Sequence, residues 1–228
     1  MDNYDKNDLT QGVIWKKLLA FFFPILLGML FQQLYNTVDA IVVGKFVGTD
    51  ALAAVGGSSA AIVSLVIGFF TGLASGATVV ISQHFGARDY ERLSLTVHTA
   101  VTFCLIIGAA LMVLGYVLAP WSLQLVKTPE NIMADSVEYL RIYFSGSIAS
   151  LIFNVGSGIL RAVGDSKRPL YYLVICCVLN IILDLLFVTS FNMGVAGVAW
   201  ATVIALVISA VLMLISLCRT GGPHRLSI

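Results

Sequence analysis

Six long apolar runs, separated by short polar breaks, dominate the pattern of hydrophobic and polar positions along the 228 residues. A bilayer core needs about 20 consecutive apolar residues per helix, and each run meets that length. The runs do not alternate with the period of two that is typical of an outer-membrane barrel strand. We therefore predict an all-α membrane protein, a six-transmembrane-helix bundle, with spans over 18–43, 53–82, 93–118, 131–160, 170–190 and 194–218.

The composition supports this fold class. Hydrophobic residues make up 59% of the chain and charged residues only 11%, with a mean hydropathy of +0.96. A soluble domain does not hide so much apolar surface while exposing so few charges. The net charge of +1 gives no sign of nucleic-acid binding. The cysteines lie in apolar runs without metal-ligand spacing, so we expect neither a disulfide framework nor a zinc site.

Lysine and arginine predict the orientation of the bundle, because cytoplasmic loops carry an excess of these residues. With segment 1–17 placed in the cytoplasm, ten of them fall inside and three outside. The inner set is Lys6, Lys16, Lys17, Arg88, Arg92, Arg161, Lys167, Arg168, Arg219 and Arg225; the outer set is Lys45, Lys127 and Arg141. We expect a multi-pass cell-membrane protein with a cytoplasmic N-terminal segment 1–17, a membrane lobe 18–218 and a cytoplasmic tail 219–228.

Glycines recur every four residues in the second span, at Gly68, Gly72 and Gly76. Such a ridge lets another helix approach closely, and we predict a helix–helix contact there. A sliding or hinge surface is the second interpretation.

Two acids, Asp39 and Asp184, lie well inside apolar runs. A charged carboxylate at the centre of a helix in lipid costs at least roughly 2.5–3.5 kcal/mol, so such residues face a protein interior or a water-filled cavity and often handle ions or protons. The alternative is a neutral aspartic acid that hydrogen-bonds another helix. We favour a proton or cation site over that alternative.

Polar neighbours extend this pattern. The first span carries Gln32, Tyr35, Asn36 and Asp39 at i, i+3, i+4 and i+7, which places them on one helical face. On the fifth span, Asn180 lies one turn before the second acid.

The depth of Thr202 in the membrane adds the span 194–218 to the predicted site. Counted from the outer helix ends at about 1.5 Å per residue, Asp39, Asp184 and Thr202 lie at similar depth. Carboxylate, amide and hydroxyl oxygens suit a proton relay or a hard cation such as Na⁺. The order of the helices around the bundle, and hence contact between these residues, is not readable from the sequence.

Four stretches resemble the multidrug and toxic compound extrusion (MATE) family of cation-coupled exporters. They are LFQQLYNTVDAIVVGKFVGTDALAAVG (30–56), SGATVVISQHFGARD (75–89), GILRAVGDSKRP (158–169), and NIILDLLF with the following GVAGVAWATVIA (194–205). The resemblance implies two six-helix lobes around a central cavity, and a chain of about twice this length. It therefore also implies a second six-helix lobe, or self-association, as a partner.

The resemblance assigns roles to individual residues. Asp39 matches the family's first-helix acid, and Asn180, Asp184 and Thr202 match its cation or proton site, where H⁺ or Na⁺ is the coupling ion. Tyr139 and Asn154 resemble residues that extend this polar network. The loops with Gln83, Gly86, Ala87 and Arg88, and with Arg161, Gly164 and Asp165, resemble signature loops, which we interpret as gating or structural elements that do not bind substrate.

The function expected from the resemblance is antiport of amphipathic organic compounds or drugs across the lipid bilayer, without an organic cofactor. A flippase for lipid-linked precursors and a non-transporting half-length membrane subunit are the alternatives. A flippase would favour a strongly basic cavity, and the spans contain almost no Lys or Arg. An enzyme is not expected, because no span carries a His/Glu/Asp cluster with metal spacing and no GxSxG motif occurs.

Overall fold

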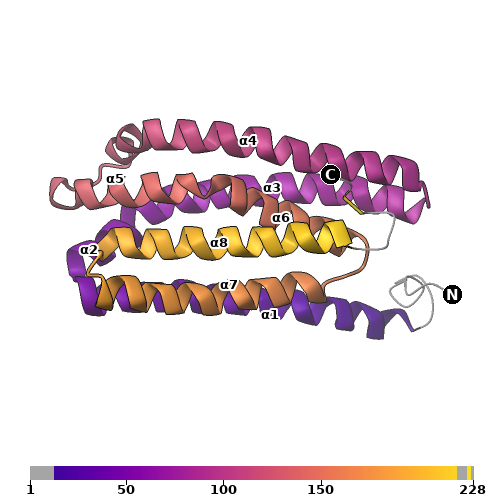
Figure 1. The fold of residues 1–228 in the computed structure, drawn as a ribbon, viewed down its shortest axis with the longest axis horizontal. Helices are drawn as coiled ribbons and strands as arrows, with labels where there is room; N and C mark the ends of the chain where they lie inside the picture. The colour runs from indigo at the N-terminus through magenta and orange to yellow at the C-terminus, as the bar shows by residue number, and fades with distance from the viewer. Residues whose placement is uncertain (1–12, 220–224, 227–228) are drawn as a thin grey trace.

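The computed structural model describes residues 13–219 and 225–226 as a bundle of long helices along one common direction (Figure 1). The helices are α1 (Ile14–Val42), α2 (Thr49–Ala53), α3 (Ser59–Gly86), α4 (Tyr90–Leu125), α5 (Glu130–Ser145), α6 (Ser147–Ala162), α7 (Lys167–Leu185) and α8 (Gly194–Arg219). Short π-helical segments at Val43–Val47, Ala54–Ser58 and Leu186–Ser190 extend α1, join α2 to α3 and extend α7. Residues 1–12, 220–224 and 227–228 of the two predicted cytoplasmic ends lie outside the described residues.

The described helices confirm the predicted all-α membrane fold. Five stretches are each long and apolar enough to cross a bilayer: Ile14–Val47, Thr49–Gly86, Tyr90–Leu125, Lys167–Ser190 and Gly194–Arg219. The fourth predicted span, 131–160, is divided at Gly146 into α5 and α6, which meet the same requirement together but bend by 51°. The break lies at Gly146, which packs closely against α8: a Cβ at this position would lie only 3.1 Å from the side chain of Val203.

Helix packing places α6 near the middle of the bundle and α1 at its edge. Helix α6 contacts α3, α4 and α8, whereas α1 packs mainly along α7 (Figure 1). Helix α1 begins and α8 ends at the same end of the bundle, where the turn after α3 and the loop after α6 also lie (Figure 1). We call this the terminal end, and we call the other the opposite end.

The glycine ridge does not make the helix contact predicted for it within the described chain. A Cβ added at Gly68, Gly72 or Gly76 would meet no atom within 4 Å. Gly72 and Gly76 instead line an open groove between α3, α4 and α6. Close helix approach occurs instead at Gly108, where a Cβ would lie 2.9 Å from the Cα of Ile148. The repeat was a poor guide because it marks a smooth face without saying which way that face points.

Candidate functional site

A pair of acids joins α1 to α7. Asp184 is fully buried and Asp39 is half-buried. Their carboxyl groups lie within hydrogen-bonding reach of each other, so a proton carried by one would be shared with the other. The described residues donate no hydrogen bond to Oδ1 of Asp39 or to either carboxyl oxygen of Asp184, although all three oxygens are buried. Two adjacent carboxylates repel when both are charged, so a bound proton or cation would stabilise the pair.

An amide on α7, one turn before Asp184, and a hydroxyl on α8 lie next to the acid pair. Asn180 Nδ2 donates a hydrogen bond of 3.3 Å to Thr202 Oγ1, which itself donates to the Val198 carbonyl oxygen at 3.1 Å. Both side chains are buried, and Oδ1 of Asn180 accepts no hydrogen bond from the described residues. Helix periodicity places Asn180 on the same face of α7 as Asp184. Both Asn180 and Asp184, one helical turn apart, therefore carry buried oxygens that accept no hydrogen bond from the described residues.

Three tyrosines lie close to the acid pair. Tyr139 interacts electrostatically with both Asp39 and Asp184, and Tyr35 interacts with Asp39. Tyr143 stacks on Tyr139, with ring centroids 6.3 Å apart. All three phenol groups are neutral hydrogen-bonding groups near neutral pH, so they can support the pair without adding charge to it.

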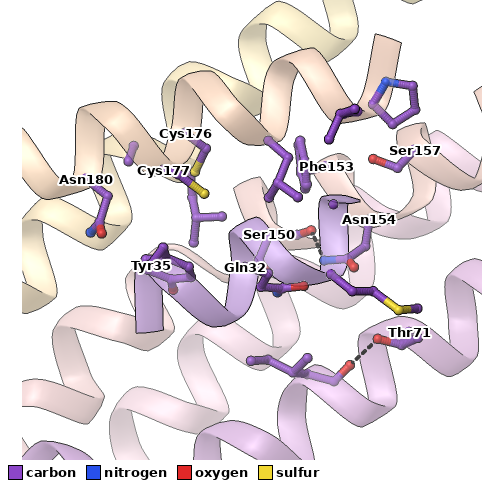
Figure 2. Close-up of a pocket in the computed structure, with 18 of the residues that line it drawn as sticks. Gln32, Tyr35, Thr71, Ser150, Phe153, Asn154, Ser157, Cys176, Cys177 and Asn180 are labelled. Carbon is purple, nitrogen blue, oxygen red and sulfur yellow. Dashed lines mark hydrogen bonds between the residues drawn. The ribbon is translucent and has the colours of Figure 1, made fainter. Parts of the chain in front are cut away.

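A cavity of about 220 Å³ lies between α1, α3, α6, α7 and α8. It extends from Asn180 and Thr202 toward the terminal end, where Arg161 and Ser166 line it. Figure 2 shows Asn180 and Tyr35 at one end of the lining and Ser157 at the other. Its apolar lining includes the following side chains: Pro24, Ile25, Met29, Phe153, Leu170 and Leu173. The cavity thus combines an apolar wall with a row of polar groups.

The structure brings most of the predicted residues to this region, in two adjoining groups. Asp39, Asp184 and Tyr139 form the acid group, and they do not line the cavity. The cavity group comprises the predicted residues Gln32, Tyr35, Asn154, Asn180 and Thr202.

Asn36 belongs to neither group. It is exposed on the surface of α1 and does not line the cavity. Successive residues on a helix are rotated by about 100°, so a residue one position from Tyr35 points well away from it.

The sequence predicted Asn154 as part of the polar network, but not the polar face of α6 to which it belongs. Ser150, Asn154, Ser157 and Arg161 follow one another on α6 and all line the cavity. Their spacing of i, i+4, i+7 and i+11 is the signal that could have revealed them. Asn154 Nδ2 donates to the Ser150 carbonyl oxygen at 2.8 Å (Figure 2).

A cavity with polar and apolar walls beside a buried acid pair, all inside a bundle of membrane-spanning helices, is typical of a membrane transporter. Comparison with known families identifies the transporter family. The MatE family model matches residues 24–186, and the chain belongs to this family of multidrug efflux transporters, which are not enzymes.

Relatives and solved structures agree with the family. The chain is 34% identical over 218 residues to the probable multidrug resistance protein YoeA of Bacillus subtilis, covering 94% of this chain and 47% of that protein. It is 34% identical over 198 residues to the probable multidrug resistance protein YpnP of the same organism, covering 87% of this chain and 44% of that protein. A crystal structure of MATE in the bent conformation matches with a TM-score of 0.87 and 28% identity, over 95% of this chain and 48% of that one. The chain therefore spans about half the length of the curated relatives it matches.

Proposed function

We propose that this chain forms one lobe of a cation-coupled antiporter that exports amphipathic organic compounds. The coupling ion, H⁺ or Na⁺, binds at Asp39, Asn180, Asp184 and Thr202. The observation that carries the proposal is the buried acid pair, whose oxygens have no donors among the described residues but adjoin a polar cavity.

The oxygen atoms of this site suit either ion. A proton shared between the Asp39 and Asp184 carboxyl groups removes their mutual repulsion. A sodium ion needs several oxygen ligands, and the buried carboxyl oxygens together with Oδ1 of Asn180 are oxygens that lack another partner among the described residues. Because either ion neutralises the same oxygens, binding of one excludes the other. Exchange of the ion when the site gains access to water then drives the two-state change that antiport requires.

A partner lobe accounts for the exposed side of α1. Gln33, Asn36 and Thr37 are exposed on this helix, within a predicted span, next to exposed apolar residues such as Leu30 and Leu34. Polar side chains in a span face protein or a water-filled cavity. We expect this side of α1 to face a second six-helix lobe, supplied by a longer chain or by another copy.

A flippase for lipid-linked precursors is the second candidate, and one observation favours it. Arg161 lines the cavity near the terminal end, so the cavity is not free of positive charge. The cavity volume of about 220 Å³ argues against a large precursor. A non-transporting half-length subunit stays an alternative that the transport experiment below addresses.

The experiment measures drug efflux from vesicles driven by an inward Na⁺ or proton gradient. Asp184→Asn and Asp39→Asn should each abolish coupled efflux while leaving the amount of protein in the membrane unchanged. The matched control is Asp50→Asn, which removes an exposed acid at the start of α2. Full gradient-dependent efflux in both site variants would contradict the proposed ion site. Absence of efflux from the unaltered chain, with or without a second lobe, would support the non-transporting alternative.

A further inference from the structure

The end of the cavity farthest from the acid pair carries an arginine. Arg161 lies in the last turn of α6 and lines the cavity. It is the only charged residue among the described residues that line this cavity. No ion pair or hydrogen bond from its guanidinium group to another described residue occurs in the structure. Arg161 is an exposed residue at the edge of the cavity. An arginine without a carboxylate partner in such a place is suited to bind an anion from outside the chain.

A buried hydroxyl lies one turn before this arginine and has no partner. Ser157 is only 2% exposed, lines the cavity, and its Oγ makes no hydrogen bond with the described residues. Figure 2 shows its oxygen turned toward the other lining residues. A buried hydroxyl without a partner is costly, because it has lost its hydrogen bonds to water. A ligand atom in the cavity would supply the missing bond.

The start of α7 completes this end of the cavity. Ser166, which is buried and lines the cavity, immediately precedes α7. The acid of this loop, Asp165, is already engaged: it accepts bonds of 3.1 Å from the amide groups of Lys167 and Arg168 and pairs with the Arg168 side chain at 3.1 Å. It therefore does not neutralise Arg161.

We propose that Ser157, Arg161 and Ser166 form an anion subsite that binds the carboxylate or phosphate group of an amphipathic ligand. The apolar part of the ligand lies against Phe153, Leu170 and Leu173. An arginine binds a carboxylate or phosphate through two parallel hydrogen bonds, and the serine hydroxyls add further donors. The inference deepens the proposed function, on which it rests, by naming the charge of the substrate.

The subsite lies at the end of the cavity opposite to Asn180 and Thr202, which adjoin the acid pair. From Ser166 to Asn180 the distance along α7 is about 21 Å, at 1.5 Å per residue. A coupling cation at the acids and an anionic group at Arg161 therefore occupy separate places. This departs from the expectation that the loop with Arg161 does not bind substrate, and it predicts that organic anions bind better than cations of the same shape.

Equilibrium binding to the purified chain in lipid nanodiscs tests the subsite. The probes are naphthoate, naphthamide and naphthylmethylammonium, which share one apolar body and differ in charge. In nanodiscs of neutral phosphatidylcholine, naphthoate should bind at least roughly tenfold more tightly than the other two, as expected for hydrogen bonds to a charged group. Arg161→Gln should remove that preference while leaving naphthamide affinity unchanged, which also shows that the variant is folded.

Two further variants sharpen the test. Ser157→Ala should weaken naphthoate binding several-fold with little effect on naphthylmethylammonium. Arg92→Gln is the matched control, because Arg92 is an exposed arginine at the same end that pairs with Asp89 at 3.4 Å and does not line the cavity. Tighter binding of naphthylmethylammonium than of naphthoate, or an unchanged naphthoate affinity in Arg161→Gln, would overturn the proposal.

Binding of naphthoate to the chain in a second set of nanodiscs, which contain phosphatidylglycerol, shows whether the anion comes from a lipid or from solution. Competition of this lipid with naphthoate would identify a lipid headgroup as the ligand, and the absence of competition would identify a soluble organic anion. Both outcomes support the subsite. These measurements need no transport, so an intact naphthoate preference without ion-coupled efflux would count against the exporter proposal alone.

Discussion

Replacing Asp184 by asparagine should make the protein more stable when no coupling ion is bound, and should remove its stabilisation by ions. The wild-type carboxyl oxygens are buried without donors, next to the Asp39 carboxyl group. An amide at this position can donate a hydrogen bond to Asp39 without needing a shared proton. A hydrogen bond to a charged group contributes about 1.5–3 kcal/mol, so we expect a gain of about 2 kcal/mol for Asp184→Asn.

The ion response should change in the opposite direction. A ligand present at 100 times its dissociation constant stabilises the folded state by about 2.7 kcal/mol. For a chain of this size, 1 kcal/mol corresponds to about 2–4 °C in melting temperature. Saturating Na⁺, or a lower pH if the ion is H⁺, should therefore raise the melting temperature of the wild type by roughly 5–10 °C and that of Asp184→Asn by almost nothing.

Thermal unfolding of the purified chain measures both effects, with a thiol-reactive dye that reports exposure of buried Cys104 and Cys177. Titrations of Na⁺ at constant ionic strength, and of pH, separate the two candidate ions. Asp50→Asn serves as control and should respond to the ion like the wild type. An equal ion-dependent shift in Asp184→Asn and wild type would refute the assignment of the ion to the acid pair. If Asp184→Asn without ions melted at a lower temperature than the ion-free wild type, the destabilising effect inferred for the unpaired carboxyl oxygens of Asp184 would be refuted.

Three further predictions follow from the packing and the orientation. Gly108→Ala should destabilise the protein by about 1–3 kcal/mol in the same thermal assay, because its Cβ would press on backbone, whereas Gly72→Ala should be neutral because open space surrounds that position. Thr202→Val should weaken ion binding by roughly tenfold in the Na⁺ or pH titration, since it leaves a buried amide donor without its acceptor. In a cysteine-free background, a membrane-impermeant thiol reagent added outside intact cells should label Lys127→Cys and spare Arg88→Cys; the reverse pattern would invert the predicted topology.

The candidate site was recognisable from sequence because lipid penalises charge. Asp39 and Asp184 are conspicuous in apolar runs, and helical spacing placed Tyr35 and Asn180 on the faces that carry them. That argument depends only on local periodicity and on the cost of a polar group in hydrocarbon, and both can be read along a single helix.

The sequence by itself determined the all-α fold, the approximate spans and the two intramembrane acids, since each depends on run length and composition within one segment. Only the tertiary structure decided which helices are neighbours. It placed Asp39 beside Asp184, left open space beside Gly72 where a helix contact was expected, and brought Arg161 to the cavity. These outcomes depend on how helices distant in sequence rotate and pack against one another, and the pattern within a helix does not contain that information.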